Sequence, residues 1–287
     1  MVQKTPLYHQ APFQHVTPVS PTNTVSTREV VLRHISTGTI TDHLHSDAIA
    51  AGPTAQIIVG SAENTKTFYV HKQLLCNSST YFNVALNNGF AETRDQIVRL
   101  DDEDPDIILT FILWLYEGKL NKETLPLDQP SGMLDRYLFK LYVLSDKRGI
   151  GRLANDTITM LASFWSQSQV NLSEVAWIIT LVSRNSKLYE LILDNLILEL
   201  RADTLHHRRL GAMDLPKEFL FDLLARTTKL SESFCQSHQC FGAVCHYHCH
   251  GEQGLPSKED CIRNTQGGCN VYFEDEELGQ GDWEGNM

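Results

Sequence analysis

The chain of 287 residues is long enough for one or two domains, and its hydrophobic share of 42% supports a folded core. The formal net charge of -11 argues against a nucleic-acid binder, because such proteins neutralise phosphates with basic side chains. No stretch approaches the ~18 consecutive apolar residues of a membrane-spanning helix. The first residues resemble neither a signal peptide nor a transit peptide, so we expect the cytoplasm or the nucleus.

Residues 1–52 are rich in Pro, Thr, Ser and His, and only the short run Val30-Val31-Leu32 is apolar. Such a composition cannot bury enough apolar surface to offset the entropy lost on folding. We therefore predict a disordered N-terminal arm over residues 1–52.

Strand signals begin immediately after this arm. Two β-rich runs, Ile57–Val59 and Thr67–Val70, lie on either side of a polar turn and predict a hairpin. Apolar residues then follow helical spacing from Leu74 to Leu86, until Asn87-Asn88-Gly89 ends the pattern. A third strand is predicted over residues 96–100.

The clearest helix signal follows this third strand. Asp104 is suited to cap the helix, Pro105 suits the first helical position, and Gly118 suits the left-handed position at the end. Apolar residues between Pro105 and Gly118 recur at intervals of one, three and four, which predicts a helix with one buried face.

The chain from residue 130 to 232 shows only helical patterns. Apolar stripes run through Met133–Leu144 and Leu153–Trp165, and further helices are expected over residues 186–201 and 216–230. No internal repeat is evident. We therefore predict an all-helical region over 130–232.

The stretch Phe68-Tyr-Val-His-Lys-Gln-Leu-Leu-Cys-Asn-Ser-Ser-Thr-Tyr-Phe82 resembles the signature of BTB/POZ domains. In that family a strand ending in Val-His-Lys passes into a helix that carries a Leu, a Ser and, three residues later, a Phe. The matching positions here are Val70, His71, Lys72, Leu75, Ser79 and Phe82. The family's order continues with Phe90-Ala91-Glu92, the strand at 97–100 and the helix end Trp114-Leu115-Tyr116-Glu117-Gly118. This combination is most similar to the BTB proteins of filamentous fungi.

The resemblance implies an α+β fold in which a small mixed sheet is flanked by helices. It also implies that residues such as His71 and Trp114 identify the fold and perform no chemistry. Combined with the patterns elsewhere, it divides the chain into an arm (1–52), a BTB/POZ domain (53–123), a helical region (130–232), a Cys/His-rich segment (233–270) and an acidic disordered tail (271–287).

The implied function is that of a protein–protein interaction adaptor and not of an enzyme. In cullin-binding BTB domains, a hydrophobic-x-Glu motif contacts the cullin scaffold of a ubiquitin ligase, and Phe90-Ala91-Glu92 has this form. An exposed aromatic anchor beside an orienting charge is typical of small binding hot spots. The alternative is that Phe90 packs onto the domain while Glu92 is solvated.

The first strand departs from the family pattern. It opens Thr54-Ala-Gln56, where many members have an acidic residue that is important to their dimer interface. The sequence therefore leaves open whether the domain forms a homodimer.

Six of the seven cysteines lie between residues 235 and 269, close to several histidines. A structural zinc ion needs four such ligands in a tetrahedron, and Cys245, His248, His250 and Cys261 would close a Cys2His2 site. The other candidates are Cys235, His238, Cys240, Cys249 and Cys269, so the quartet is not unique. Ligand-free packing and disulfide or redox use are the alternatives.

A second class of function is a self-associating transcriptional or chromatin regulator that contacts DNA through the metal segment. An enzyme that uses the Cys/His cluster is a third. Gly149-Ile-Gly151-Arg-Leu-Ala154 matches a dinucleotide-binding fingerprint in form, but a helix and not a strand is expected before it. We interpret these glycines as a connection between two helices.

Overall fold

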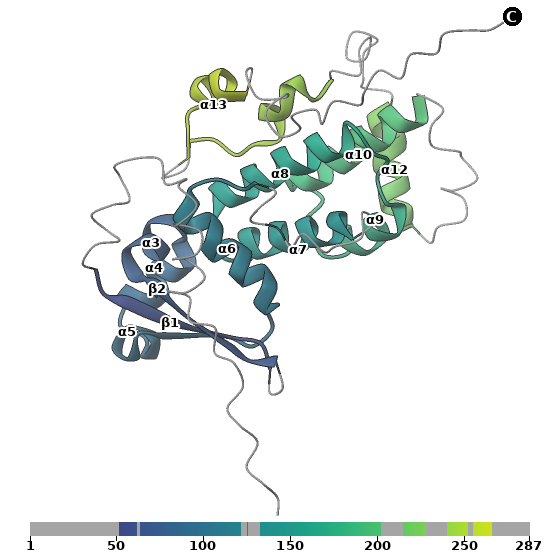
Figure 1. Ribbon diagram of the computed structural model, residues 1–287. Helices are drawn as coiled ribbons and strands as arrows, with labels where there is room; N and C mark the ends of the chain where they lie inside the picture. The colour runs from purple at the N-terminus through teal and green to yellow at the C-terminus, as the bar shows by residue number, and fades with distance from the viewer. Residues whose placement is uncertain are drawn as a thin grey trace, which may run out of the picture.

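The computed structural model describes residues 52–61, 64–121, 125, 133–201, 215–227, 240–251 and 255–265. Within these ranges, a small sheet with short helices adjoins a body of longer helices, and a C-terminal segment lies along that body (Figure 1). The predicted acidic tail, and the predicted arm up to residue 51, fall outside the described residues.

The sheet is mixed, as the sequence resemblance implied. Strand β1 (Thr54–Val59) is central; β2 (Lys66–His71) pairs with it antiparallel, and β3 (Ile97–Leu100) pairs with it parallel. Every second residue of β1 is buried, namely Ala55, Ile57 and Val59. This alternation lets one face of the sheet pack against helices.

The helical pattern from Leu74 to Leu86 forms two helices where a single run was expected, α3 (Lys72–Ser78) and α4 (Thr80–Asn87). Ser79 between them is extended, and its hydroxyl accepts a hydrogen bond from the Phe82 amide at 3.1 Å. The same hydroxyl donates to the Arg148 carbonyl at 2.5 Å. Ser79 therefore caps α4 and ties it to a distant turn.

A short helix, α5 (Ala91–Asp95), follows where no helix was predicted. It ends at Gln96, whose φ of 54° places it in the left-handed region, so the third strand begins one residue later than expected. Helix α6 (Pro105–Glu117) forms as predicted. Asp104 caps it by accepting the Asp106 amide at 3.0 Å, and Gly118 ends it at a φ of 72°.

The remaining helices confirm the predicted helical region. They are α7 (Leu134–Lys147), α8 (Gly151–Trp165), α9 (Leu172–Ile178), α10 (Lys187–Arg201) and α12 (Lys217–Thr227). Gly149 lies in the turn between α7 and α8 with a φ of 59°, which supports its interpretation as a connection between helices.

One hydrophobic core runs from the sheet into the helical body. Phe82 of α4 stacks on Phe111 of α6 with ring centroids 5.9 Å apart, and Leu138 and Leu141 of α7 are fully buried in the same cluster. The two regions therefore depend on each other for burial.

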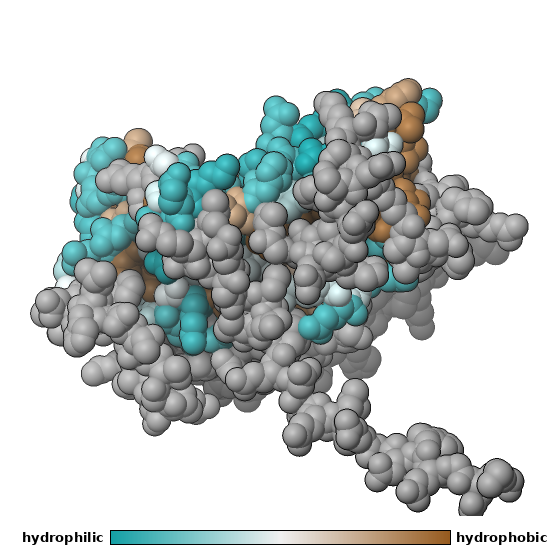
Figure 2. Space-filling view, turned by 90° about the horizontal axis from the view of Figure 1, so that it is seen from above, coloured by the Kyte–Doolittle hydropathy of each residue, from teal (hydrophilic) through white to brown (hydrophobic). Residues whose placement is uncertain are grey.

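The C-terminal segment contains the 3-10 helix η4 (Cys240–Tyr247), which contacts α8 and α10, and helix α13 (Lys258–Thr265), which contacts η4 (Figure 1). Apolar surface gathers at the α12 end of the molecule in the view of Figure 2, and α12 exposes Leu220, Phe221 and Leu224 there.

Candidate functional site

The loop before α5 holds the hydrophobic-x-Glu motif. Phe90 is the N-cap residue of α5 and is 56% exposed, so it does not pack into the core. Ala91 is exposed and Glu92 is half-buried in the first turn. Among the described residues, the Glu92 carboxylate forms no ion pair with a basic side chain.

Hydrogen bonds hold this loop in place. The Thr93 hydroxyl donates to the Ala85 carbonyl at 2.9 Å and accepts from the Gly89 amide at 3.0 Å. The Phe90 carbonyl accepts from the Thr93 amide at 3.1 Å. Phe90 is thus presented to solvent on a backbone that is already ordered.

The other residues of the sequence signature build the domain. Leu75 and Phe82 are fully buried, and Lys72 donates to the Leu86 carbonyl at 2.9 Å. His71 lies at the junction of β2 and α3, where its Nδ1 is 2.7 Å from the Tyr116 hydroxyl. This position agrees with a structural role for His71.

The remaining signature residues lie in β2, at the cap of α4 and in or just after α6. Val70 is buried in β2, Ser79 caps α4, and Trp114 and Leu115 are buried in α6 before Gly118 ends that helix.

Near the C-terminus, three candidate ligands come together. The ligand atoms of Cys245, His250 and Cys261 all lie within 4.8 Å of one another. The Cys245 sulfur is 3.3 Å from Nε2 of His250, and both cysteines are buried. This group could hold a metal ion.

The fourth predicted ligand is next to this group. Nδ1 of His248 lies 3.1 Å from the Cys261 sulfur, and the His248 side chain is buried. Burial, reinforced by the neighbouring His250, lowers the pKa of His248 to about 4, so its ring is neutral near pH 7. Burial, with Cys245 adding to it, raises the pKa of Cys261 to about 12.

Each imidazole turns its second nitrogen toward an oxygen. Nε2 of His248 is 2.9 Å from the Thr159 hydroxyl, and that hydroxyl donates to the Asn155 carbonyl at 3.1 Å. Nδ1 of His250 is 3.4 Å from the Pro256 carbonyl oxygen. In both rings one nitrogen faces a cysteine sulfur, and in His250 that nitrogen, Nε2, is also 3.2 Å from the Cys245 carbonyl oxygen.

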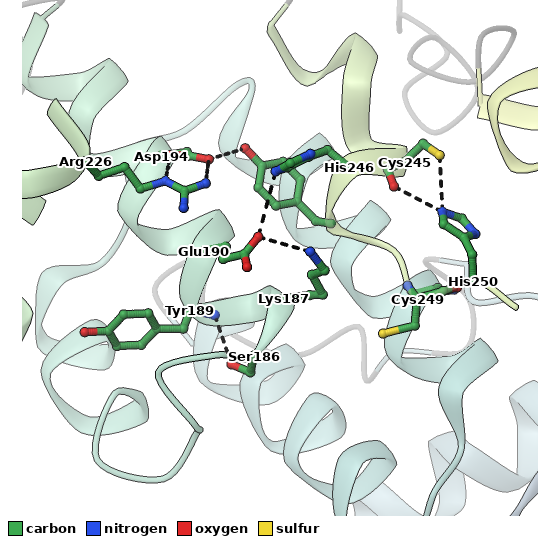
Figure 3. A network of polar contacts seen from close by, with 12 residues as sticks. Ser186, Lys187, Tyr189, Glu190, Asp194, Arg226, Cys245, His246, Cys249 and His250 are labelled. Carbon is green, nitrogen blue, oxygen red and sulfur yellow. Dashed lines mark hydrogen bonds and ion pairs between the residues drawn. The ribbon is translucent and has the colours of Figure 1, made fainter. Parts of the chain in front are cut away.

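Several contacts join the cluster to the helical body. The Asn155 amide group donates to the Cys249 carbonyl at 3.0 Å and accepts from the Cys249 amide at 2.9 Å. The Tyr247 hydroxyl donates to Asp194 at 2.7 Å, and Arg226 donates to the same carboxylate at 2.5 and 2.7 Å (Figure 3).

Sequence reasoning missed these supporting residues. Thr159 and Asn155 lie in a predicted helix about ninety positions before the cysteines, and no local spacing links them to the cluster. Of the spare candidates, Cys249 is not in the group of three, and the side chains of Cys235, His238, Cys240 and Cys269 lie outside the described residues.

The comparison with curated proteins found no match. None of the helices in the described part of the chain is long and apolar enough to cross a membrane. The family model of the BTB/POZ domain matches residues 54–142, which reaches from β1 into α7. That match covers the mixed sheet and the helices around it, and such domains are generally protein-interaction modules. The chain therefore contains a BTB/POZ domain at residues 54–142.

Proposed function

We propose that this protein is a non-enzymatic adaptor whose BTB/POZ domain recruits a cullin-type ubiquitin ligase scaffold through Phe90, Ala91 and Glu92. The observation that carries the proposal is the exposure of Phe90, 56%, beside a carboxylate that has no ion-pair partner among the described residues. Aromatic side chains that become buried on association dominate many protein interfaces, and a neighbouring charge fixes the orientation of the partner.

The order of the loop supports the same proposal. Thr93 bonds to Ala85 and Gly89, so the backbone around Phe90 is fixed before a partner arrives. Ordering a loop during association costs free energy, and a loop that is already fixed avoids most of that cost.

Affinity capture of the full chain, with the bound proteins identified by mass spectrometry, tests the adaptor role. We expect a cullin to be captured by the natural sequence and to be lost with Glu92→Ala. Tyr69→Ala is the matched control, because Tyr69 is an aromatic residue of the same domain with a similar exposure, 57%. A clean capture without a cullin, or equal capture by Glu92→Ala, would contradict the proposal.

We also propose that this BTB/POZ domain is of the filamentous-fungal type and that the protein acts in the cytoplasm or the nucleus. We further propose that the domain can form a homodimer. Sedimentation of the purified chain over a range of concentrations measures self-association. A sedimentation coefficient that increases with concentration would support a dimer, and a constant monomer value would exclude it in that range.

We also propose that Cys245, His248, His250 and Cys261 bind one structural zinc ion. Zinc–ligand bonds of about 2.3 Å to sulfur and 2.05 Å to nitrogen place those atoms about 3.6 Å apart in a tetrahedron. The sulfur–nitrogen distances of 3.3 Å (Cys245–His250) and 3.1 Å (Cys261–His248) are close to that value. His248 is not in the group whose ligand atoms all lie within 4.8 Å of one another, so its ring has to move toward the other ligands to complete the tetrahedron.

Metal analysis of the purified chain tests this site. We expect about one zinc ion per chain, as four protein ligands close a structural site. Cys261→Ser should remove it, and the control Cys249→Ser should retain it, because the Cys249 sulfur points away from the Cys245 sulfur and the His250 ring (Figure 3). Zinc that is retained by Cys261→Ser, or lost equally with Cys249→Ser, would contradict the ligand set.

A further inference from the structure

We infer that the metal site is a latch that docks the C-terminal segment from η4 to α13 on helices α8 and α10. In this latch Thr159 and Asn155 of α8 act as positioning residues. The inference rests on the proposed binding of zinc. It adds that the bound metal holds the C-terminal segment against the helical body.

The first support is the orientation of His248. With Thr159 2.9 Å from its Nε2, the ring presents Nδ1 to the Cys261 sulfur. Histidine ligands commonly donate their second N–H to an oxygen, which fixes both the tautomer and the direction of the ring. Because that oxygen comes from α8, the ligand geometry depends on docking.

The second support is Asn155, which lies one turn before Thr159 on the same helix. Its buried side chain makes two hydrogen bonds to the backbone of Cys249, between the ligands His248 and His250. If the segment left α8, this amide group would exchange both hydrogen bonds for bonds to water. Hydrogen bonds within the protein contribute a modest net stabilisation over bonds to water, so docking and ligand geometry favour each other.

The third support comes from the rest of the segment. Tyr247 donates to Asp194 of α10, a carboxylate that Arg226 of α12 also binds (Figure 3). At the start of α8, a β-carbon added to Gly151 would lie 3.2 Å from Leu255, so the backbone there approaches the segment closely. Tyr247 and Leu255, which both lie between ligands in the sequence, thus contact the helical body.

The latch follows from how these contacts are connected. The ligands come from η4, from the loop after it and from α13, and a common metal would join all three parts more firmly than the direct contacts between them, such as that of the Cys245 sulfur with the Lys258 carbonyl at 3.9 Å. The polar contacts to the body are centred on residues 247–249, between the ligands. Removing the metal should therefore loosen α13 first and then the contacts with α8, because metal binding is coupled to the folding of the site that it creates.

Hydrogen exchange of the full chain, with zinc bound and after removal of zinc by a chelator, tests the latch. We expect peptides covering residues 245–261 to exchange at least tenfold faster without zinc, since the Cys249 and Cys261 amides are then less protected. Peptides of α6 should change little. Re-addition of zinc chloride should restore the protection.

Variants of the positioning residues separate the latch from simple metal binding. Thr159→Val keeps all four ligands and should weaken zinc affinity, measured by competition with a chromophoric chelator, by about 10- to 100-fold. Thr180→Val changes an exposed threonine in the turn after α9, where its hydroxyl bonds the Trp177 carbonyl, and should leave the affinity unchanged. Asn155→Ala should increase exchange over residues 245–261 with zinc still bound.

The outcomes are distinct. Stoichiometric zinc with unchanged exchange after its removal would overturn the latch and leave the metal site standing. Failure to bind zinc at all would overturn both, without affecting capture of a cullin through Glu92. Equal zinc affinity of Thr159→Val and Thr180→Val would overturn the role of Thr159, and the circular dichroism of each variant confirms that it is folded.

Discussion

Asp156 of α8 allows a test of how burial of a carboxyl group changes the stability of the fold with pH. Its carboxylate lies where the BTB/POZ domain meets the helical body. Nε1 of Trp114 donates to it at 2.7 Å. Burial raises the pKa of Asp156 from 3.8 to about 6, although the Trp114 hydrogen bond and the charge of Arg152 act in the opposite direction. The folded protein therefore holds this proton more tightly than the unfolded chain.

The effect on stability follows from that difference. This group stabilises the fold most below about pH 4, and the contribution is lost as the pH rises through 6. With these two pKa values, the loss between pH 4.5 and 7.5 amounts to about 2 kcal/mol. Asp156→Asn removes the ionisation and keeps an oxygen that can accept the Trp114 hydrogen bond, so its stability relative to the natural sequence should rise by that amount over this range.

Urea denaturation at a series of pH values, followed by circular dichroism, measures the effect. Any pH-independent effect of Asp156→Asn on the free energy of unfolding cancels. Only the change with pH in the difference between the variant and the natural sequence is compared. Asp222→Asn is the control: Arg184 lowers the pKa of Asp222, so that carboxylate stays ionised throughout the range. If the difference in free energy of unfolding between Asp156→Asn and the natural sequence stays constant with pH, the pKa of Asp156 is not raised in the folded protein.

Three other substitutions test individual contacts by urea denaturation at pH 7.5. Ser79→Ala removes the cap that accepts the Phe82 amide and should cost about 1.5 kcal/mol. Gly118→Ala places a β-carbon at a φ of 72° and should cost about 1 kcal/mol, whereas no change would show that the turn relaxes. Trp165→Phe leaves the buried Asp135 without its 2.7 Å donor and should cost about 2 kcal/mol; a neutral result would argue that water replaces the indole.

Local signals in the sequence predicted those parts of the fold that depend on neighbouring residues. Helix α6 formed between Asp104 and Gly118 because a side-chain cap and a left-handed glycine act over one turn. The hairpin likewise followed from two β-rich runs and a polar turn.

Features set by distant contacts were not predictable in this way. Ser79 interrupts an unbroken helical pattern because its hydroxyl serves both the Phe82 amide and the Arg148 carbonyl, which is 69 positions away. Spacing predicted Cys245, His250 and Cys261 as candidate ligands, and the structure brings these three together, but Thr159 is a hydroxyl on a helix far from them in the sequence. Only the tertiary structure brings that hydroxyl to His248.

We propose that the loop at Phe90 binds a cullin scaffold. Isothermal titration of the purified full chain with a purified cullin from the same organism measures this binding. We predict saturable one-to-one binding that Phe90→Ala weakens by at least tenfold, or about 1.4 kcal/mol, while Tyr69→Ala leaves it unchanged. Absence of binding, or equal affinity for Phe90→Ala and the natural sequence, would contradict the account.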